Sequence, residues 1–282
     1  MESKAVHLIK YANEGIIGPE HFEIRTTTVD VSDAALNDGD VALKTLVVSP
    51  DPYLRGQLRE KHLFSGEPNE IKLGDVLKGF VVVKVIASKR ADLPVGTILG
   101  ASLPYRTVQV VSEAAFKLTV SWNLTAHVTE ETASLGVGVL GMPGSTAYGG
   151  LLDVLRPNRG EVLFVSGAAG AVGGFVGMLA KNLFGCTVIG SCGGPAKCKL
   201  VTESYGFDHA IDYKTVSSTE ELLAKIKAVA PDGIDMYFDN VGGMHFEAAF
   251  RSLRPKGRIA VCGGISEYDS ATVKPVAINP LQ

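Results

Sequence analysis

A glycine-rich turn constrains this chain more than any other feature of its sequence. Three glycines stand at three-residue spacing, and they are Gly167, Gly170 and Gly173. The apolar run Val162–Val165 before them is typical of a strand buried on both faces of a parallel sheet. Small and apolar residues from Ala171 predict a helix that ends at Gly185, and Cys186–Gly190 predicts a second strand. Because glycines let the backbone and a helix N-terminus approach a pyrophosphate, this unit predicts a dinucleotide site.

The spacing of the glycines in this motif leaves a second interpretation open, a turn that is purely structural. GxxGxxG differs from the GxGxxG fingerprint, and a glycine-rich turn can be purely structural, but the strands on both sides favour a cofactor. An NAD site usually carries an acid after its second strand for the ribose hydroxyls, and Ser191–Ala196 contains none. Lys197 follows instead. A cation suits a 2′-phosphate, so we expect NADP(H), with an ordinary solvated lysine as the alternative.

Composition and charge limit the function class. The chain has 282 residues, 46% of them hydrophobic, which is enough for one large or two ordinary packed domains. A net charge of −3, from 27 basic and 30 acidic residues mixed along the chain, gives no case for nucleic acid or a membrane as partner. No apolar run reaches membrane-spanning length and no signal-peptide core is present, so we expect a cytoplasmic protein. Its four cysteines are then expected to be reduced, and they are Cys186, Cys192, Cys198 and Cys262.

Short strand-like runs fill the first part of the chain. They are Phe22–Thr28, Asp40–Val48, Gly79–Ser88, Thr97–Leu103 and Thr107–Val111, separated by turn residues. Such a series predicts a small barrel or sandwich. Two prolines in Ser49–Gly56 cannot continue a central strand, so we expect an ordered loop that exposes Tyr53 and Arg55. Tyr53 is a candidate to face a ligand, with a rigid corner as the alternative.

Helical signals follow this β-rich part. Acids in the first turn predict a helix that starts at 129–132, and a second helix is expected after Pro143 as far as Leu155. We therefore place a domain boundary near residue 125.

Strands and helices alternate after the glycine turn. The expected strands are His209–Ile211, Ile234–Phe238 and Arg258–Cys262. Three helices are expected among them: the first ends at Phe207, and the other two span Thr219–Val229 and Gly242–Leu253. This alternation predicts a doubly wound parallel sheet, in which ligands bind at the carboxyl ends of the strands. The loops Asp239–Gly243 and Gly263–Tyr268 follow two of these strands, so we expect both at the crevice of the glycine turn. Asn240 suits a nicotinamide ribose or carboxamide, with a simple turn residue as the alternative.

Metal ligands are not arranged in a recognisable pattern. A zinc alcohol dehydrogenase would need Cys, His and acid ligands in the first domain, yet residues 1–185 contain no cysteine. The pair Cys192 and Cys198 alone is no zinc site, and the six histidines are scattered. We therefore expect no metal site.

Several separate motifs resemble one known family. They are Gly141–Tyr148, the turn Ala168–Gly173, Ala196–Cys198, Asp212–Lys214, Tyr237–Gly243 and Cys262–Tyr268, together with Asp51–Arg55, which resembles the family's DPYMR. On these motifs the chain resembles the zinc-free medium-chain dehydrogenases/reductases that reduce alkenal and prostaglandin double bonds with NADPH. This is the prostaglandin reductase and NADP-dependent alkenal double-bond reductase family, also described as leukotriene B4 12-hydroxydehydrogenase-like. The resemblance covers essentially the whole chain.

The resemblance implies an α/β protein with a GroES-like β-barrel over residues 1–125 and a Rossmann domain, a doubly wound parallel sheet, over 126–282. NADPH and substrate are then expected in the cleft between the two domains. By matching motifs, the expected cofactor contacts are Gly170, Ala171, Val172 and Gly173 for the pyrophosphate, Lys197 and Tyr213 for the 2′-phosphate, and Asn240, Cys262, Gly263, Gly264, Ile265, Ser266 and Tyr268 for the nicotinamide half. The strand end without an acid agrees with the NADPH that the family uses.

The implied reaction is reduction of the carbon–carbon double bond of α,β-unsaturated aldehydes and ketones, such as 2-alkenals, enones and 15-oxo-prostaglandins. A hydride adds to the β-carbon, and the developing enolate oxygen needs hydrogen-bond donors in a dry site. We expect Tyr268 and Tyr53 to be catalytic, with Tyr268 or water protonating the α-carbon. Two alternatives stay open, a quinone reductase of the same fold and an NADPH-binding protein without activity.

The resemblance also sets an expectation for the end of the chain. Members of the family continue after the fifth strand of the parallel sheet with another strand, a helix and a return into the barrel, whereas this sequence ends at Gln282. We therefore expect the chain to lack the last strand and that return, and to be poorly soluble or weakly active by itself. A homodimer, implied by the family, would depend on the same strand.

Overall fold

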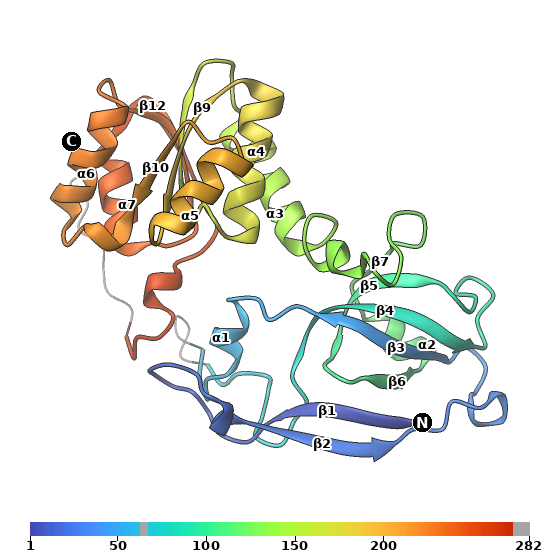
Figure 1. Cartoon of the computed structure of the whole chain (residues 1–282). Helices are drawn as coiled ribbons and strands as arrows, with labels where there is room; N and C mark the ends of the chain where they lie inside the picture. Colours follow the sequence, from blue (N-terminus) through green and yellow to red (C-terminus); the bar gives the residue numbers. More distant parts are fainter. Residues whose placement is uncertain (63–66, 273–282) are drawn as a thin grey trace. The chain divides into compact units, whose positions relative to one another are not determined.

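The structure is a computed structural model that describes residues 1–62 and 67–272 (Figure 1). The chain divides into two compact units. The first unit consists of Met1–Met142 and Asp269–Ala271, and the second contains Pro143–Tyr268. Residues 126–142 thus belong to the first unit, although the sequence placed them in the second domain. Whether the two domains are divided near residue 125 remains a prediction.

The first unit is built from antiparallel strands. Its five-stranded sheet has the order β6-β3-β4-β5-β7, and β1 pairs with β2 in a separate ribbon. The strands are β1 (Glu2–Leu8), β2 (Phe22–Thr28), β3 (Val41–Val48), β4 (Lys78–Ser88), β5 (Ile98–Pro104), β6 (Val108–Val111) and β7 (Ser121–Asn123), and the helices are α1 (Leu54–Gln57) and α2 (Glu113–Lys117). The five strands predicted here are confirmed within two residues. In place of a fully paired barrel, the described residues show a sheet and a ribbon joined by isolated bridges such as Ala5 to Arg106.

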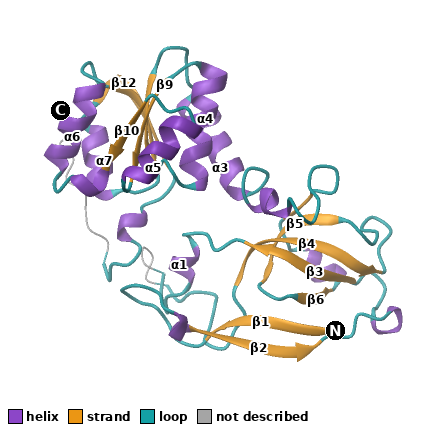
Figure 2. Ribbon diagram, viewed as in Figure 1, coloured by secondary structure: helices purple, strands orange, loops and turns teal. Residues whose placement is uncertain are grey.

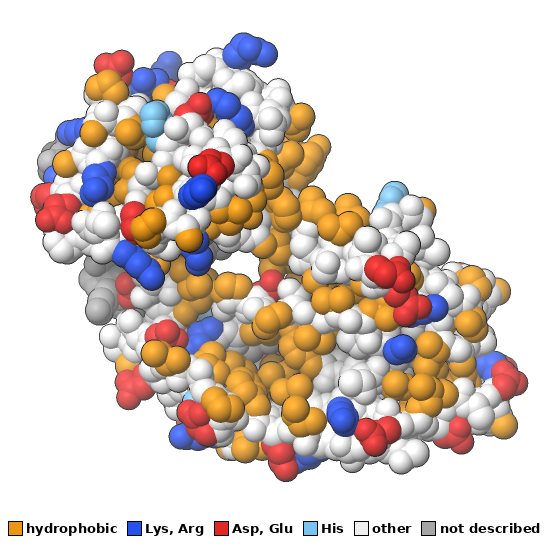
Figure 3. Space-filling model, viewed as in Figure 1, with side chains coloured by type: hydrophobic (Ala, Val, Ile, Leu, Met, Phe, Trp, Pro, Cys, Tyr) orange, Lys and Arg blue, Asp and Glu red, His pale blue; other side chains and the backbone are white. Residues whose placement is uncertain are grey.

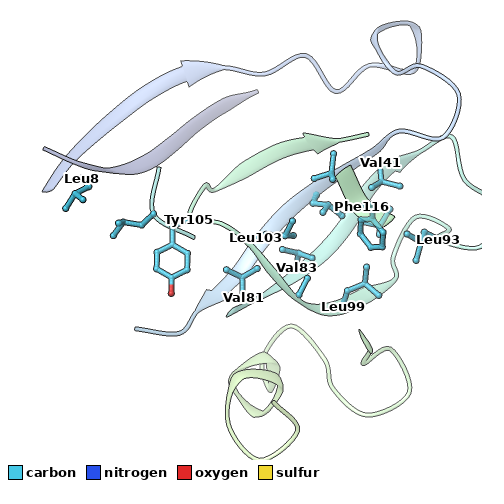
Figure 4. Packing of buried hydrophobic residues seen from close by; sticks show 14 of the residues in the cluster. Leu8, Val41, Val81, Val83, Leu93, Leu99, Leu103, Tyr105 and Phe116 are labelled. Carbon is cyan, nitrogen blue, oxygen red and sulfur yellow. The ribbon is translucent and has the colours of Figure 1, made fainter. Parts of the chain in front are cut away.

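The core of the first unit lies under β4. Val81 and Val83 of β4 point into a cluster with Leu99 and Leu103 of β5 and with Phe116 of α2, as Figure 4 shows. These side chains are buried, and each fully buried valine or leucine contributes roughly 1.5–3 kcal/mol. Because alternate residues of a strand face opposite sides, Val82 packs in a second cluster with Leu124. Both faces of β4 are therefore covered.

The second unit is a parallel sheet with helices on both faces (Figure 2). Its strand order is β10-β9-β8-β11-β12. The strands are β8 (Val162–Ser166), β9 (Thr187–Cys192), β10 (His209–Asp212), β11 (Ile234–Asp239) and β12 (Leu253–Val261), and the helices are α3 (Met142–Gly149), α4 (Ala171–Phe184), α5 (Pro195–Lys199), α6 (Thr219–Val229) and α7 (Gly243–Phe250). Counted along the chain this order is third, second, first, fourth and fifth, so it reverses between β8 and β11. The predicted doubly wound sheet is confirmed, and this reversal is where such sheets bind ligands.

Two buried clusters enclose this sheet. On one side Leu163 and Val165 of β8 pack against α4 through Val176 and Ala180. On the other side Phe164 packs in the cluster that contains residues of α6 and α7. Continuous apolar strands are required here because both faces of the sheet are covered.

One helix prediction was wrong, and a second was confirmed in its bounds but not in its helix type. A helix starting at 129–132 is absent from the described residues, and a 3-10 helix, Ala133–Val137, follows instead. Glycines disfavour an α-helix there, and a Cβ on Gly136 would lie 2.5 Å from Leu124. The helix expected to run to Leu155 is α3 followed by a π-helical turn, Gly150–Leu155.

The surface carries charges of both signs. On the face drawn in Figure 3, basic and acidic side chains lie interspersed, as the small net charge of −3 leads one to expect. No helix within residues 1–62 and 67–272 is long and apolar enough to cross a bilayer.

Candidate functional site

The glycine turn joins β8 to α4 in the second unit. Gly167 has a φ of +62°, and its carbonyl accepts the N–H of Gly170 at 2.9 Å. A Cβ on Gly173 would lie 2.5 Å from that same carbonyl oxygen, so the first turn of α4 packs against the loop too closely for a side chain. Within the described part of the chain, no side chain caps α4 at Gly170 and no acid lies in its first turn. The N–H groups and dipole of α4 are therefore suited to an anion such as a pyrophosphate.

A buried polar network lies where the strand order reverses. The hydroxyl of Tyr237 donates to Oδ1 of Asp239 at 2.6 Å, and the two residues are 0% and 2% exposed. Ser166 Oγ lies 3.3 Å from the same carboxylate oxygen. Burial, with the charge of Asp239, raises the pKa of Tyr237, so its hydroxyl stays protonated and donates. The network ties the end of β8 to the end of β11.

Asp239 also shapes the loop that follows β11. Its Oδ1 accepts the N–H groups of Val241 and Gly242 at 3.0 and 2.9 Å. Asn240, which lies between Asp239 and Val241, donates from Nδ2 to the carbonyl of Ser166 at 2.7 Å. A Cβ on Gly167 would lie 3.3 Å from Cβ of Asn240, so the amide stands directly beside the glycine turn.

The loop after β12 is held against the loop after β11. The carbonyl of Asp239 accepts the N–H of Cys262 at 2.8 Å and that of Gly263 at 3.0 Å. Further along, Ser266 donates from N and Oγ to the carbonyl of Val241, at 3.1 and 2.7 Å. Glycines at 242 and 264 allow this approach, since a Cβ on Gly242 would lie 3.3 Å from Cα of Gly264. Gly170–Gly173, Asn240 and the segment Cys262–Tyr268 are thus gathered at one edge of the sheet.

Tyr268 folds back over its own loop. Its hydroxyl accepts the N–H of Gly264 at 3.4 Å, and a Cβ on Gly263 would lie 3.0 Å from that hydroxyl. The tyrosine therefore stands beside the segment that the sequence assigned to the nicotinamide.

Lys197 and Tyr213 lie at the neighbouring strand ends. Lys197 is exposed on α5 and forms no ion pair with any described acid. A Cβ on Gly193 would lie 3.0 Å from the Tyr213 hydroxyl, so the phenol rests on the loop before α5. Asp212 holds that loop, because its Oδ1 accepts the N–H of Gly194 at 2.8 Å. This hydrogen bond lowers the pKa of Asp212.

A buried histidine supports Tyr213, and no motif in the sequence indicates it. His245 is 4% exposed, its Nε2 lies 2.9 Å from Oγ of Ser191, and its ring meets the ring of Tyr213 edge-on at 5.6 Å. Burial lowers the pKa of His245 to about 4, so the imidazole is neutral near pH 7. Ser166, Ser191, Tyr237, Asp239 and His245 were all missed as supporting residues, although Tyr237 and Asp239 lie within a quoted motif.

Tyr53 belongs to the first unit, in the loop after β3. It is 36% exposed, and its ring meets that of Phe80 edge-on at 6.2 Å. Burial, followed by the nearby charge of Asp51, raises the pKa of Tyr53. The tyrosine borders a groove of about 700 Å³, whose lining includes Gln57 and Asn69. The loop is ordered, as expected, and its tyrosine faces a space that could hold a ligand.

Arg55 is not exposed, contrary to the expectation for this loop. It is 6% exposed, because Nε donates to Oδ1 of Asp269 at 2.8 Å and the other nitrogens donate to the carbonyls of Ala12 and Gly15. Arg59 donates to the carbonyl of Ser270 at 2.6 Å. These arginines bind the segment that directly follows Tyr268.

No metal centre was found in the part of the chain that the structure describes. Among residues 1–62 and 67–272, no three His, Cys, Asp or Glu side chains gather in a way that could hold an ion.

Comparison with known proteins gives matches over nearly the whole chain. Residues 4–118 match the family model described as the N-terminal domain of oxidoreductase, and residues 171–281 match the model described as zinc-binding dehydrogenase. Prostaglandin reductase 1 of Mus musculus is 40% identical over 257 residues, which are 91% of this chain and 71% of that protein. The 2-alkenal reductase (NADP(+)-dependent) of Nicotiana tabacum is 35% identical over 271 residues, 95% of this chain and 74% of that one. The crystal structure of CurA in complex with NADPH from Vibrio vulnificus has a TM-score of 0.81 and 32% identity, and the match covers 98% of this chain and 76% of CurA.

Proposed function

The chain belongs to the zinc-free medium-chain dehydrogenase/reductase family of prostaglandin and alkenal reductases, and on that premise we propose that it reduces the carbon–carbon double bond of α,β-unsaturated aldehydes and ketones with NADPH. The observation that carries the proposal is the gathering of the glycine turn, Asn240 and the loop 262–268 at the point where the strand order reverses. In sheets of this kind, that point binds a dinucleotide.

The residues present fit NADPH. The uncapped N-terminus of α4 and the side-chain-free contact at Gly173 suit a pyrophosphate. Lys197 and Tyr213 would bind the 2′-phosphate, while Asn240 and the segment Cys262–Tyr268 would hold the nicotinamide half. Bound NADPH supplies the hydride that adds to the β-carbon of the substrate.

The side chains of the protein stabilise the negative charge that develops on the carbonyl oxygen of the substrate. A neutral hydroxyl in a dry site is a suitable donor for that oxygen. Burial raises the pKa of Tyr53, so this hydroxyl remains protonated near pH 7 and can donate. Tyr268 is the second proposed donor, and it or a water molecule delivers the proton to the α-carbon.

Quaternary structure and location belong to the same proposal. We infer a cytoplasmic location and a homodimer, as in the family that the sequence resembles, with the dimer dependent on the strand that the family places after the fifth strand of the parallel sheet. Size-exclusion chromatography with light scattering measures the mass of the assembly, and a monomer at micromolar concentration would contradict the dimer.

The test of the function is reduction of a medium-chain 2-alkenal, followed by the absorbance of the reduced nicotinamide, with NADPH and NADH in parallel. We expect NADPH to be preferred. Replacing Lys197→Ala should raise KM for NADPH about tenfold and leave KM for NADH unchanged, because one charge-assisted contact is lost. Lys199→Ala is the matched control, since Lys199 is an exposed lysine that forms an ion pair with Glu203.

A comparison of two substrates distinguishes reduction of the double bond from reduction of the carbonyl group. The saturated aldehyde of the same length should not be turned over, whereas the 2-alkenal should yield that saturated aldehyde. Tyr268→Phe should lower kcat by roughly ten- to hundredfold with little change in KM for NADPH. Formation of an alcohol product, or equal use of both cofactors, would overturn the proposal.

A further inference from the structure

Two thiols lie side by side at the edge of the sheet. Cys192 is the last residue of β9 and Cys198 lies in α5. The Sγ atoms are 3.5 Å apart, and both thiols are free. Cys192 is 2% exposed, whereas Cys198 is half-buried and therefore within reach of a small reagent. The five residues between them include Lys197.

We propose that Cys192 and Cys198 form a reversible disulfide that closes the loop 193–197 and weakens the grip of Lys197 on the 2′-phosphate. The bond itself depends only on the two thiols. Its effect on the cofactor rests on the proposed function.

The loop between the thiols can absorb the movement that the bond requires. The sulfur atoms must approach from 3.5 Å to about 2 Å. Two glycines begin the loop, and Gly194 has a φ of +91° with no heavy atom within 4 Å of a Cβ placed on it. The N–H of Gly194 is held by Asp212, so the change falls on the residues after it, at the start of α5. Lys197 lies in that turn and moves with Cys198.

The chemistry is thiol–disulfide exchange with glutathione disulfide. Cys198 attacks one sulfur of the reagent, the S–S bond breaks, and one glutathione thiolate leaves. Cys192 then attacks Cys198 Sγ, its proton passes to solvent, and the second glutathione leaves. Two protein thiols lose two electrons in total, and one glutathione disulfide becomes two glutathiones.

Burial assigns the two roles. It raises the pKa of Cys192 to about 12, and the neighbouring Cys198 adds to this shift. Cys192 is therefore a poor first nucleophile and acts second, once Cys198 carries the glutathione.

The first experiment measures the bond without any cofactor. The full chain is equilibrated in glutathione buffers of increasing oxidised fraction, quenched in acid and alkylated, and its intact mass is recorded. We expect a loss of two hydrogen atoms and of two alkylation sites, both reversed by dithiothreitol. A mixed glutathione adduct without an internal bond would overturn the proposal.

Peptide mapping locates the bond. Trypsin releases Asn182–Lys197 and Cys198–Lys199, which a disulfide would link. Because the longer peptide also contains Cys186, the Cys186→Ala variant is mapped as well. The link should persist in Cys186→Ala and vanish in Cys198→Ser, and the reverse pattern would overturn the assignment.

The second experiment measures the consequence by nicotinamide fluorescence. Oxidation should weaken NADPH binding about tenfold, the value of one charge-assisted contact, and leave NADH binding unchanged. Cys198→Ser should bind NADPH equally in both buffers. If the disulfide forms while the affinity for NADPH stays constant, the proposal that the disulfide weakens NADPH binding is overturned. If the reduced protein binds no NADPH, the proposed function fails while the mass still reports the bond.

Discussion

The carboxyl edge of the parallel sheet and the loop around Tyr53 hold their residues in different ways. At the sheet edge, loops are joined by backbone hydrogen bonds, and glycines such as Gly173 allow the backbones of neighbouring segments to approach each other closely. Around Tyr53, long side chains do the joining, above all Arg55, which reaches Asp269 and two carbonyl groups. The first arrangement depends on backbone atoms and on short side chains that bind the neighbouring loop, such as Asp239 and Asn240. The second depends on a long side chain that reaches distant segments.

The two regions therefore tolerate different substitutions. At the sheet edge, an added carbon atom is damaging because there is no space for it. Around Tyr53, a removed side chain is damaging because its buried partners lose their donor. Four predictions test the comparison, in order of expected effect.

The largest effect is expected for Gly173→Val. Its Cβ would lie 2.5 Å from the Gly167 carbonyl oxygen, so α4 must shift, and we expect a loss of about 3 kcal/mol of unfolding free energy and no measurable NADPH binding. Chemical denaturation measures the unfolding free energy, and nicotinamide fluorescence measures NADPH binding. Gly149→Ala is the control, because its Cβ meets nothing closer than 3.9 Å and the helix gains stability. Normal NADPH binding by Gly173→Val would contradict the close-packing argument.

Removing the carboxylate of Asp239 should have the next largest effect. Asp239→Ala leaves the N–H groups of Val241 and Gly242 without their acceptor and removes the shorter of the two hydrogen bonds that the Tyr237 hydroxyl donates, at a cost of roughly 2–3 kcal/mol. KM for NADPH should rise, since the loop that carries Asn240 is released. The same measurements on Asp232→Ala, an exposed aspartate, should show almost no change. An unchanged KM for Asp239→Ala would show that the loop keeps its shape by other means.

Arg55→Ala should cost about 2 kcal/mol, because the carbonyls of Ala12 and Gly15 are left without a donor, while Asp269 is 59% exposed and can be solvated. In turnover, kcat should fall while KM for NADPH stays constant, since the segment after Tyr268 loosens but the sheet edge does not. Arg25→Ala, which breaks an exposed ion pair with Glu23, is the control and should cost almost nothing. A rise in KM for NADPH would blur the distinction between the two regions.

The smallest effect is a pH dependence from His245. Its pKa is lowered by burial from 6.5 to about 4, so the unfolded chain binds a proton more readily than the folded one. The stability from neutral His245 is fully present above pH 6.5 and is lost as pH falls towards 4, with roughly 1 kcal/mol gone at about pH 5.5. Denaturation at several pH values should show a weaker slope for His245→Gln, and His127→Gln, at an exposed position, should keep the original slope.

The second unit could be predicted well because its signals are local. For α6, the predicted span Thr219–Val229 agrees with the structure, since Ser218 caps the N-terminus and accepts the N–H of Glu221 at 3.2 Å. The glycine turn likewise follows from spacing within a few residues. The family motifs extended this to residues that share one sheet edge, because parallel strands bring their carboxyl ends together.

The first unit was harder because its determinants lie far apart in sequence. Strand β1 was missed, and its buried Ser3 is explained by hydrogen bonds with the carbonyl and the N–H of Val108, 105 residues away. Arg55 looked like an exposed loop residue because its partner Asp269 lies 214 positions further on. No pattern in a short window contains such pairs.

The pairing of Arg55 with Asp269 has a consequence for synthesis on the ribosome. Residues of the first unit emerge early, but Asp269 and Ser270, which Arg55 and Arg59 bind, are added 214 and 211 positions later. At 5–20 residues per second, these guanidinium groups wait roughly 10–40 seconds for these late partners, whereas the carbonyls of Ala12 and Gly15 are already present. The first part of the chain to be translated is therefore among the last to complete its native contacts, and a nascent chain has to keep two arginines hydrated in the meantime.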